Sequence, residues 1–184
     1  MAKVLAIVVT YNAMKWTDKC LGSLFSSRLR PDVLVVDNGS TDGTREYVRS
    51  LFPEAELILS DGNPGFGAAN NIGLRLALER GYDFVYLLNQ DAWVEKDTIS
   101  TLVAAARPDF GILSPVQNDA SGRFDPWFSR KCSKYLKAAL AVAPDPRLVV
   151  DVPFVMAAHW LVSRKALLEV GGFSPAFAQY GEDD

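Results

Sequence analysis

Residues 33–44 read VLVVDNGSTDGT, a short apolar run that ends in a cluster of turn and helix-capping residues. The same change from an apolar run to polar loop residues, followed by a helical pattern, recurs along the first 113 residues. Runs that are apolar at nearly every position are typical of parallel strands whose sheet is covered on both faces. Repeated strand–helix units therefore predict an α/β fold, with a doubly wound, mostly parallel, Rossmann-like sheet and helices on both faces.

The predicted elements alternate regularly before residue 113 and less regularly after it. The expected strands of the first part are Val4–Val9, Val33–Asp37, Glu56–Ser60, Asp83–Leu88 and Phe110–Leu113. The expected helices are Thr17–Ser27, one ending near Leu51 before Pro53, Gly67–Glu79 and Asp97–Arg107. Prolines and glycines then interrupt the pattern, and the remaining expected elements are a helix over Trp127–Leu140, a strand over Phe154–Val162 and a helix over Arg164–Val170.

Length and composition predict one soluble domain of 184 residues, with 49% apolar and 22% charged residues. The net charge of −3 argues against a nucleic-acid-binding protein, and a small ligand or a saccharide fits better. Cys20 and Cys132 have no metal-binding spacing, so we interpret them as reduced thiols. No apolar run is long enough for a signal-peptide core or a membrane span, which favours a cytoplasmic location.

Polar residues gather where the predicted strands end. Tyr11 and Asn12 follow the first strand, Asp37 ends the second, and Asn89 and Asp91 follow the fourth. Doubly wound sheets bind ligands outside the carboxyl ends of their strands, so we expect these segments to converge on one ligand. For any one acidic residue alone, a turn or helix cap is the usual interpretation, so the prediction depends on the coincidence of these positions.

Two other classes of nucleotide enzyme fit the sequence poorly. The run GFGAAN at residues 65–70 matches only the first two glycines of the dinucleotide fingerprint G-x-G-x-x-G. It also follows the third predicted strand, whereas that fingerprint follows the first, and the first turn has no glycine. A nucleotidyltransferase would need a glycine-rich loop with Lys or Arg after the first strand, and Thr10–Trp16 has no such pattern.

Several ordered blocks of the chain resemble glycosyltransferase family 2. They are VVTYN (8–12), VDNGSTDGT (36–44), NPGFGAANNIG (63–73), LLNQD (87–91), AAHWLVSR (157–164), GGF (171–173) and YGEDD (180–184). The subgroup that the chain resembles most is that of the bacterial rhamnosyltransferase-like enzymes of polysaccharide assembly. The resemblance implies a GT-A fold and an inverting transfer of a hexose, such as rhamnose, from a UDP- or dTDP-sugar. The implied acceptor is a saccharide or a lipid-linked saccharide.

The resemblance also implies a nucleotide-sugar site. Asp37 would accept a hydrogen bond from the imide N–H of the pyrimidine, and the alternative role is to cap the turn before the next helix. The residues around it would line the base and ribose pocket or approach the nucleotide with backbone and amide groups. The full predicted set is Thr10, Tyr11, Asn12, Asp37, Asn38, Gly65, Asn71, Asn89 and Gln90.

By the same resemblance, Asp91 is the last carboxylate of a D-x-D motif that binds Mg²⁺ or Mn²⁺. Asn89 stands where the first acid of that motif is expected, and an amide brings no charge. Asp183 aligns with the catalytic base, and Glu182 would orient the acceptor or share that role. Without the preceding Gly-Gly-Phe and Tyr-Gly residues, the acidic end would be interpreted as a frayed terminus without a role.

The resemblance implies a single domain over residues 1–184, with a nucleotide-sugar-binding part (1–113) and an acceptor-side part (114–184). Members of the family continue past the Glu-Asp pair, so we expect the domain to be incomplete at its C-terminus. The alternative function is a truncated, non-catalytic module that binds nucleotide-sugar.

Two features remain open in the acceptor-side part. His159 is the only histidine, and we expect a half-buried core residue, with acceptor contact as the alternative; Trp160 is expected in the core. Residues 124–140 combine aromatic and basic side chains. This segment predicts either an acceptor-side helix with a solvated basic face or a peripheral contact with the inner face of an anionic membrane.

Overall fold

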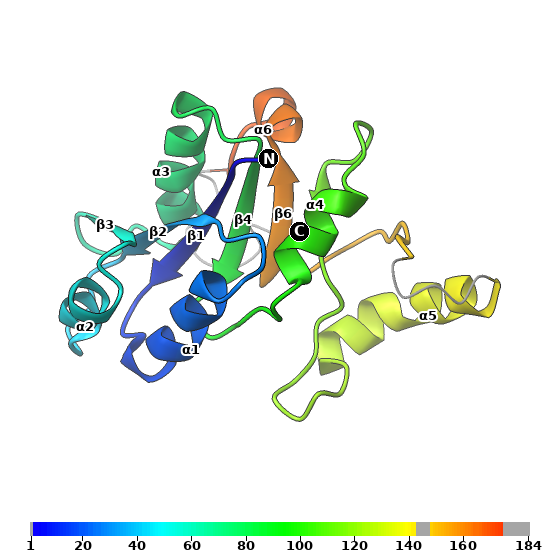
Figure 1. Cartoon of the computed structure of the whole chain (residues 1–184), viewed down its shortest axis with the longest axis horizontal. Coiled ribbons are helices and arrows are strands. Elements are labelled where there is room, and N and C mark those ends of the chain that lie inside the picture. The colour runs from blue at the N-terminus through cyan, green and yellow to red at the C-terminus, as the bar shows by residue number, and fades with distance from the viewer. Residues whose placement is uncertain (1, 143–147, 175–184) are drawn as a thin grey trace.

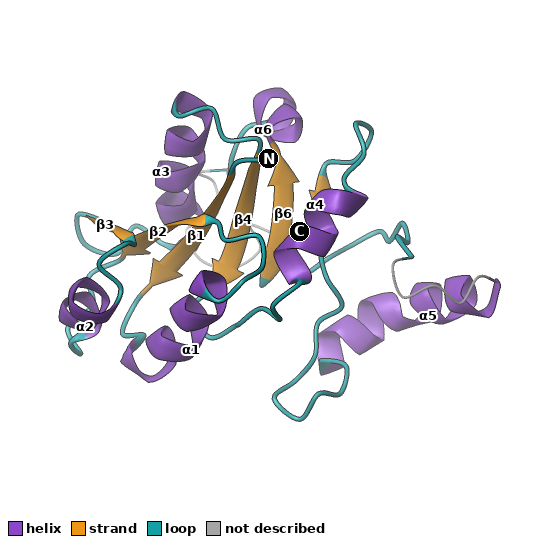
Figure 2. Cartoon of the chain, in the orientation of Figure 1, coloured by secondary structure: helices purple, strands orange, loops and turns teal. Residues whose placement is uncertain are grey.

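The computed structural model describes residues 2–142 and 148–174, and the structural statements that follow concern these residues. A six-stranded sheet forms the centre of the molecule, in the order β3-β2-β1-β4-β6-β5 (Figures 1 and 2). Its strands are β1 (Val4–Thr10), β2 (Asp32–Asp37), β3 (Glu56–Leu59), β4 (Phe84–Asn89), β5 (Ile112–Leu113) and β6 (His159–Ser163). The helices are α1 (Met14–Phe25), α2 (Thr44–Leu51), α3 (Phe66–Glu79), α4 (Thr98–Ala105), α5 (Pro126–Val142) and α6 (Arg164–Val170).

The predicted mostly parallel α/β sheet is confirmed. β1 pairs in parallel with both β2 and β4, and β3 pairs in parallel with β2. β6 differs, because it lies between β4 and β5 and runs antiparallel to both. The fifth strand in sequence is therefore an edge strand of two residues that touches β6 rather than β4.

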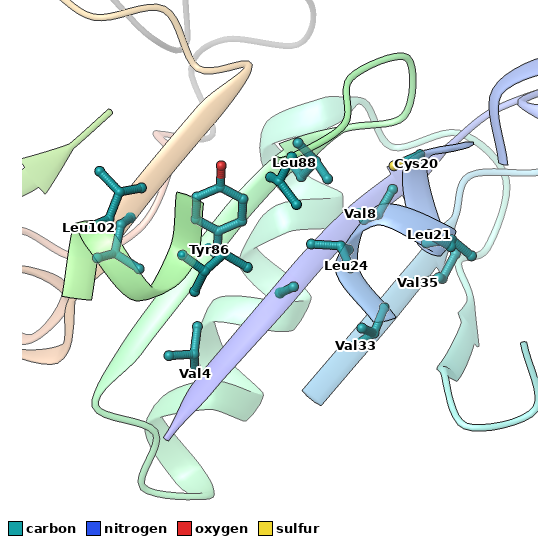
Figure 3. Packing of buried hydrophobic residues seen from close by; sticks show 14 of the residues in the cluster. Val4, Val8, Cys20, Leu21, Leu24, Val33, Val35, Tyr86, Leu88 and Leu102 are labelled. Carbon is teal, nitrogen blue, oxygen red and sulfur yellow. The ribbon is translucent and has the colours of Figure 1, made fainter. Parts of the chain in front are cut away.

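Two apolar layers cover the sheet, which explains the unbroken apolar sequence of β1. Val4, Ala6 and Val8 belong to one layer, with side chains of α1, α2 and α4 (Figure 3). Leu5, Ile7 and Val9 belong to the other, which is covered by α3 and α6. Because successive side chains of a strand point to opposite faces, a strand buried on both faces needs an apolar residue at every position.

Helix α3 lies unusually close to the sheet at Gly73. A Cβ atom at this position would stand 2.5 Å from the Cδ1 atom of Ile7 on β1. Glycine is therefore required by the close approach of the helix backbone to the strand. The contact therefore holds the middle of α3 against the middle of β1.

The part after residue 113 agrees with the predicted pattern in two elements and differs in one. Helices α5 and α6 form where they were expected. The predicted strand over Phe154–Val162 was too long, since pairing begins only at His159. The indole N–H of Trp160 donates to the carbonyl oxygen of Val155 at 3.2 Å, which folds the preceding residues back instead of extending the ladder. None of the described helices combines the length and apolarity needed to cross a membrane.

Candidate nucleotide-sugar site

Three strands end at the same edge of the sheet, and a fourth begins there. The register pairs Thr10 with Asp37, Val9 with Asn89, and Leu88 with His159. The loops that follow β1, β2 and β4 therefore leave the sheet side by side. The structure thus brings three of the predicted polar segments together, namely 10–12, 37–38 and 89–91.

Asp37 is the last residue of β2 at this edge and is fully buried, with 0% of its surface exposed. Its Oδ1 atom accepts hydrogen bonds from the backbone N–H groups of Gly39 (3.2 Å) and Ser40 (2.9 Å) and from Nε of Arg45 (2.5 Å). Its Oδ2 atom accepts from the hydroxyl groups of Thr10 (2.9 Å) and Ser40 (2.5 Å). Five donors from three parts of the chain therefore converge on one carboxylate.

The buried carboxylate of Asp37 remains ionised because its partners stabilise the charge. Burial by itself raises the pKa, but the hydrogen bonds from Ser40, Arg45 and Thr10 outweigh it, so the pKa lies below its ordinary value. Both oxygens already accept from groups of the protein. A hydrogen bond from a pyrimidine N–H would need one of these donors to move aside, and the predicted base contact of Asp37 stays a prediction.

The loop after β1 is fastened to the loop after β2. Asn12 has a positive φ of 51°, and its backbone N–H donates to Oγ of Ser40 at 2.9 Å. Its Oδ1 atom accepts from the backbone N–H of Thr41 at 2.9 Å. The N–H groups of Ala13 and Met14, at the start of α1, donate to Thr44 and Asp42. The two loops cap each other and form one rigid unit.

Gln90 connects this unit to the end of β4. Its Oε1 atom accepts from the backbone N–H of Tyr11 at 2.8 Å, and its Nε2 atom donates to the Tyr11 carbonyl at 3.3 Å. The side-chain amide thus binds both backbone groups of Tyr11, as a neighbouring strand would. The ring of Tyr11 stays 48% exposed above the edge.

Asn38 and Gly65 tie a third loop to the edge. Asn38 is 3% exposed, donates from Nδ2 to the carbonyl oxygen of Gly65 at 3.2 Å, and accepts from the hydroxyl of Ser60 at 3.0 Å. Gly65 is the N-cap residue immediately before α3, and its positive φ of 92° is a conformation that favours glycine. The side chain of Asn38 therefore holds the loop before α3 close to the loop after β2.

Asn89 and Asp91 place side-chain oxygen atoms at the end of β4. The Oδ1 atom of Asn89 is buried and is the one such side-chain atom without a hydrogen-bond partner among the described residues. Asp91 is exposed in the turn that follows β4. Hard divalent cations bind carboxylate and amide oxygens and commonly complete their shell with substrate phosphates. Residues 2–142 and 148–174 hold no cluster of three or more metal-binding side chains.

Comparison with known proteins settles the family. Residues 5–171 match the profile of the family described as "Glycosyl transferase family 2". The chain belongs to glycosyltransferase family 2.

Two curated relatives illustrate its place in the family. The N-acetylglucosaminyl-diphospho-decaprenol L-rhamnosyltransferase of Mycobacterium tuberculosis (strain ATCC 25618 / H37Rv) is 29% identical over 212 residues, which cover 100% of this chain and 69% of the relative. The undecaprenyl-phosphate mannosyltransferase of Micrococcus luteus is 32% identical over 108 residues, which cover 57% of this chain and 44% of the relative.

The solved structures agree with a GT-A glycosyltransferase fold. Mannosyltransferase PcManGT from Pyrobaculum calidifontis, solved with GDP-Man and Mn²⁺, matches with a TM-score of 0.74 and 26% identity. The match covers 99% of this chain and 49% of that one, so the chain spans about half the length of PcManGT. S. aureus TarS matches with a TM-score of 0.73 at 21% identity, over 98% of this chain and 32% of that one, which shows the fold alone.

Within this glycosyltransferase fold, Asn71 has a role that sequence reasoning missed. Its Nδ2 atom donates to the carbonyl of Phe173, and its Oδ1 atom accepts from the Phe173 N–H, both at 2.8 Å. A Cβ on Gly172 would lie 2.2 Å from that Oδ1 atom, so the pairing requires glycine there. Asn71 therefore holds the Gly-Gly-Phe segment on α3, and its predicted contact with the nucleotide stays a prediction.

Two further sequence expectations concern Trp160 and His159. Trp160 is in the core, as expected, and its ring stacks on Phe173 with centroids 6.1 Å apart. His159 is partly buried, and its Nδ1 atom lies 2.9 Å from the hydroxyl of Tyr86. The partner Tyr86 was not among the predicted residues, because a tyrosine inside an apolar strand gives no sign of its polar contact.

Glu182 and Asp183, the predicted catalytic pair, lie outside the described residues. The last described residues of the chain, Phe173 and Ser174, follow the glycine pair that Asn71 holds. The roles of Glu182 and Asp183 rest on the sequence alone.

Proposed function

We propose that the chain is the donor-binding part of an inverting glycosyltransferase that moves a sugar from a UDP- or dTDP-sugar to a saccharide or lipid-linked saccharide acceptor. One observation carries the proposal. The same edge of the sheet presents an exposed aromatic ring (Tyr11), an unpartnered buried amide oxygen (Asn89) and an exposed carboxylate (Asp91). An aromatic ring can stack on a base, and a polar acceptor can bind a ribose hydroxyl. A carboxylate can bind the cation that accompanies a diphosphate.

In this proposal, the base and ribose lie against the loops after β1 and β2. Tyr11 would stack on the base, because its backbone is held on both sides by Gln90 while its ring remains half-exposed. Thr10, Asn12 and Asn38 would shape the pocket through the hydrogen bonds that fix the loops. Rigid loops lower the entropy lost on binding, which favours a preformed site.

A divalent cation fits the end of β4. Asp91 would bind it through its carboxylate, and the free Oδ1 atom of Asn89 could accept from the ribose or coordinate through its amide oxygen. When bound, Mg²⁺ or Mn²⁺ would neutralise the diphosphate that leaves with the nucleotide. A neutral Asn89 in place of an acid gives the protein one negative charge fewer there, so the affinity for free cation should be weak and should rise with nucleotide bound.

For the acceptor side we propose roles for residues 114–184. Asp183 would take the proton of the acceptor hydroxyl as that hydroxyl attacks the anomeric carbon, and Glu182 would orient the acceptor. A lipid-linked acceptor is suggested by the names of the relatives, which contain diphospho-decaprenol and undecaprenyl phosphate. In that case the protein would work in the cytoplasm at the inner membrane face and take part in bacterial polysaccharide synthesis.

Helix α5 is the part of the chain that suits a membrane surface. It carries Arg130, Lys131, Lys134 and Lys137 and no acidic residue, while Trp127 beside them is 56% exposed. Anionic headgroups attract such a helix, and its aromatic side chain can enter the interface. Vesicles with anionic lipid should sediment the protein, and the triple change of Lys131, Lys134 and Lys137 to Glu should abolish this. Equal sedimentation of both proteins would contradict the membrane contact.

The second candidate is a non-catalytic module that binds nucleotide-sugar. It is favoured by Asn89, which brings no charge to the cation site. Transfer of radiolabelled sugar to acceptor or water separates the two candidates, because the module would bind the donor without releasing the sugar.

Calorimetric titration with UDP, dTDP and GDP, with and without Mn²⁺, tests the donor site. We expect saturable binding of a pyrimidine nucleotide that strengthens with Mn²⁺, whereas the Asp91→Ala variant should bind equally with and without the cation. Absence of binding by UDP and dTDP under every condition would overturn both candidates. Preference for GDP, the nucleotide part of the donor bound to PcManGT, would overturn the pyrimidine assignment.

A further inference from the structure

Tyr86 and His159 form a polar pair inside an apolar layer. The two residues lie on the neighbouring strands β4 and β6, where Leu88 is paired with His159 and Tyr86 with Leu161. Tyr86 is 0% exposed, and its hydroxyl oxygen is 2.9 Å from Nδ1 of His159. In Figure 3 the Tyr86 hydroxyl points toward the end of the sheet where Leu88 and Cys20 lie, which is the carboxyl edge of β4.

The pairing fixes which nitrogen of His159 carries the proton. Burial raises the pKa of Tyr86, so its phenol keeps its hydrogen. Nδ1 of His159 is the one hydrogen-bond partner of that hydroxyl found in the described part of the chain. A fully buried O–H needs an acceptor, so the hydroxyl donates and Nδ1 accepts. The neutral ring must then carry its proton on Nε2.

The His159 ring also stays neutral. Burial lowers its pKa to about 4, and no ion pair with a carboxylate is found for it in the described residues. A neutral imidazole with Nδ1 occupied presents a single N–H donor, at Nε2, throughout the physiological pH range. No hydrogen bond to Nε2 occurs within residues 2–142 and 148–174.

His159 stands beside the proposed donor site. It is the first residue of β6, and the carbonyl of the preceding residue, Ala158, accepts from the N–H of Asn89 at 3.1 Å. β6 lies on the side of β4 away from β1 and β2. His159 is therefore next to the Asn89–Asp91 turn, but on the opposite side of β4 from the loops proposed to hold the base.

We propose that His159 determines sugar specificity: its Nε2–H, held in this tautomer by Tyr86, donates a hydrogen bond to a hydroxyl oxygen of the transferred sugar or of the acceptor saccharide. This inference rests on the proposed function. The neutral, partly buried ring of His159 suits a neutral hydroxyl oxygen as its partner. A phosphate or carboxylate beside it would raise the pKa of the ring and favour its protonation. Tyr86 acts only through His159 and is a positioning residue.

Nitrogen-15 NMR tests the tautomer directly, since the chain has 1 histidine and so gives one set of ring signals. Between about pH 6 and pH 8 we expect the neutral ring with its proton on Nε2. Tyr86→Phe keeps the buried ring but removes the donor, so this variant should give a mixture of the two tautomers. An Nδ1–H tautomer or an imidazolium in the unchanged protein would overturn the proposal.

Ligand titrations with the same signals separate the two sources of the hydroxyl. The probes are UDP, UDP-glucose, dTDP-rhamnose and free N-acetylglucosamine. We expect UDP to leave the Nε2 signal in place and one sugar-bearing probe to shift it while the ring stays neutral. A shift with a nucleotide-sugar places the hydroxyl on the donor, and a shift with N-acetylglucosamine in the presence of UDP places it on the acceptor. No shift with any sugar, or protonation of the ring, would overturn the proposal.

Two substitutions separate hydrogen bonding from structural support. The amide nitrogen of Gln reaches about as far as Nε2 of histidine, whereas that of Asn reaches only about as far as Nδ1. His159→Asn should weaken binding of the responsive sugar about 2- to 10-fold, and His159→Gln should restore most of it. UDP affinity should be unchanged in both. Equal sugar affinity in the two variants, with equal thermal stability, would contradict the role of Nε2–H.

The calorimetric titration with UDP and dTDP distinguishes failure of the proposed function from failure of the proposal for His159. If neither UDP nor dTDP binds, the proposed function fails whatever His159 does. If a pyrimidine nucleotide binds but no sugar affects the ring signals of His159, the donor site stands and only the role of His159 is lost.

Discussion

The carboxyl edge of β1 and β2 and the helix α5 are built in opposite ways. At the edge, Asp37, Ser40 and Thr44 are polar yet almost fully buried, and each is hydrogen-bonded to another loop. Helix α5 has 17 residues, of which Phe128 and Cys132 are buried. A cavity of about 850 Å³ lies between it, α4 and residues 148–155.

This difference separates the proposed donor site from the helix that we propose contacts a membrane surface. Polar groups buried with all their partners fix a single geometry, which suits recognition of a small ligand. A basic helix that borders a cavity and buries few residues suits contact with a larger, anionic surface. Figure 1 shows α5 at the side of the molecule, away from the helices that cover the sheet.

The largest effect is expected at Asp37. Its replacement by Ala leaves Arg45 and four other donors without their acceptor, so the free energy of unfolding should fall by about 3–5 kcal/mol in urea denaturation. Asp61→Ala, at an exposed carboxylate on a nearby loop, is the control and should change stability by less than about 0.5 kcal/mol. A loss at Asp37 below about 1 kcal/mol would mean that the edge is not held by this carboxylate.

Matched leucine substitutions compare how much the apolar contacts of α1, beside the carboxyl edge, and those of α5 contribute to stability. Leu24 in α1 is 0% exposed, and Leu24→Ala should lower the free energy of unfolding by about 2–4 kcal/mol because it leaves a cavity in a closed core. Leu136 in α5 lines the existing cavity, and Leu136→Ala should cost less than about 1 kcal/mol. Equal losses in urea denaturation would show that α5 packs as firmly as α1.

Glycine substitutions test how closely the helices that cover the sheet pack against it. Gly73→Ala should lower stability by about 1–3 kcal/mol, because its Cβ would stand 2.5 Å from Ile7. Gly22→Ala, in the middle of α1 with no atom within 4 Å of a Cβ, should raise stability by about 0.5–1 kcal/mol. Thermal denaturation measures both, and a stabilising Gly73→Ala would contradict the close approach of α3 to β1.

The smallest effect concerns pH. The folded-state pKa of Asp37 lies below its unfolded value, so its ionised form contributes stability that is fully present above about pH 4 and lost as the pH falls through the folded pKa. The stability difference between the unchanged protein and Asp37→Asn should therefore narrow as urea denaturation is repeated from about pH 7 down to pH 3. A constant difference would show that the charge of Asp37 contributes nothing.

The sequence predicted the parallel part of the fold well, because its strands are apolar at every position and its helices have clear starts and ends. It did not predict that β6 would enter between β4 and β5. Strand order depends on contacts between residues far apart in the chain, such as Leu87 with Trp160, and no local pattern records them.

In the candidate site, too, some features follow from local sequence and others depend on contacts between distant residues. Position at a strand end was enough to bring residues 10–12, 37–38 and 89–91 together. The partners of each side chain could not be predicted, since Gln90 and Asn71 bind backbone groups of segments that are distant in the chain. A motif gives the residue types at a site but not which of them hold the loops and which remain free for a ligand.

Backbone amide NMR during titration with UDP or dTDP and Mg²⁺ tests the central claim that the carboxyl edge is the nucleotide site. We expect the amide signals of Tyr11, Asn12 and Asp91 to shift with saturation, and those of α5 to remain in place. Shifts confined to α5, or none at the edge when binding is saturated, would contradict the assignment.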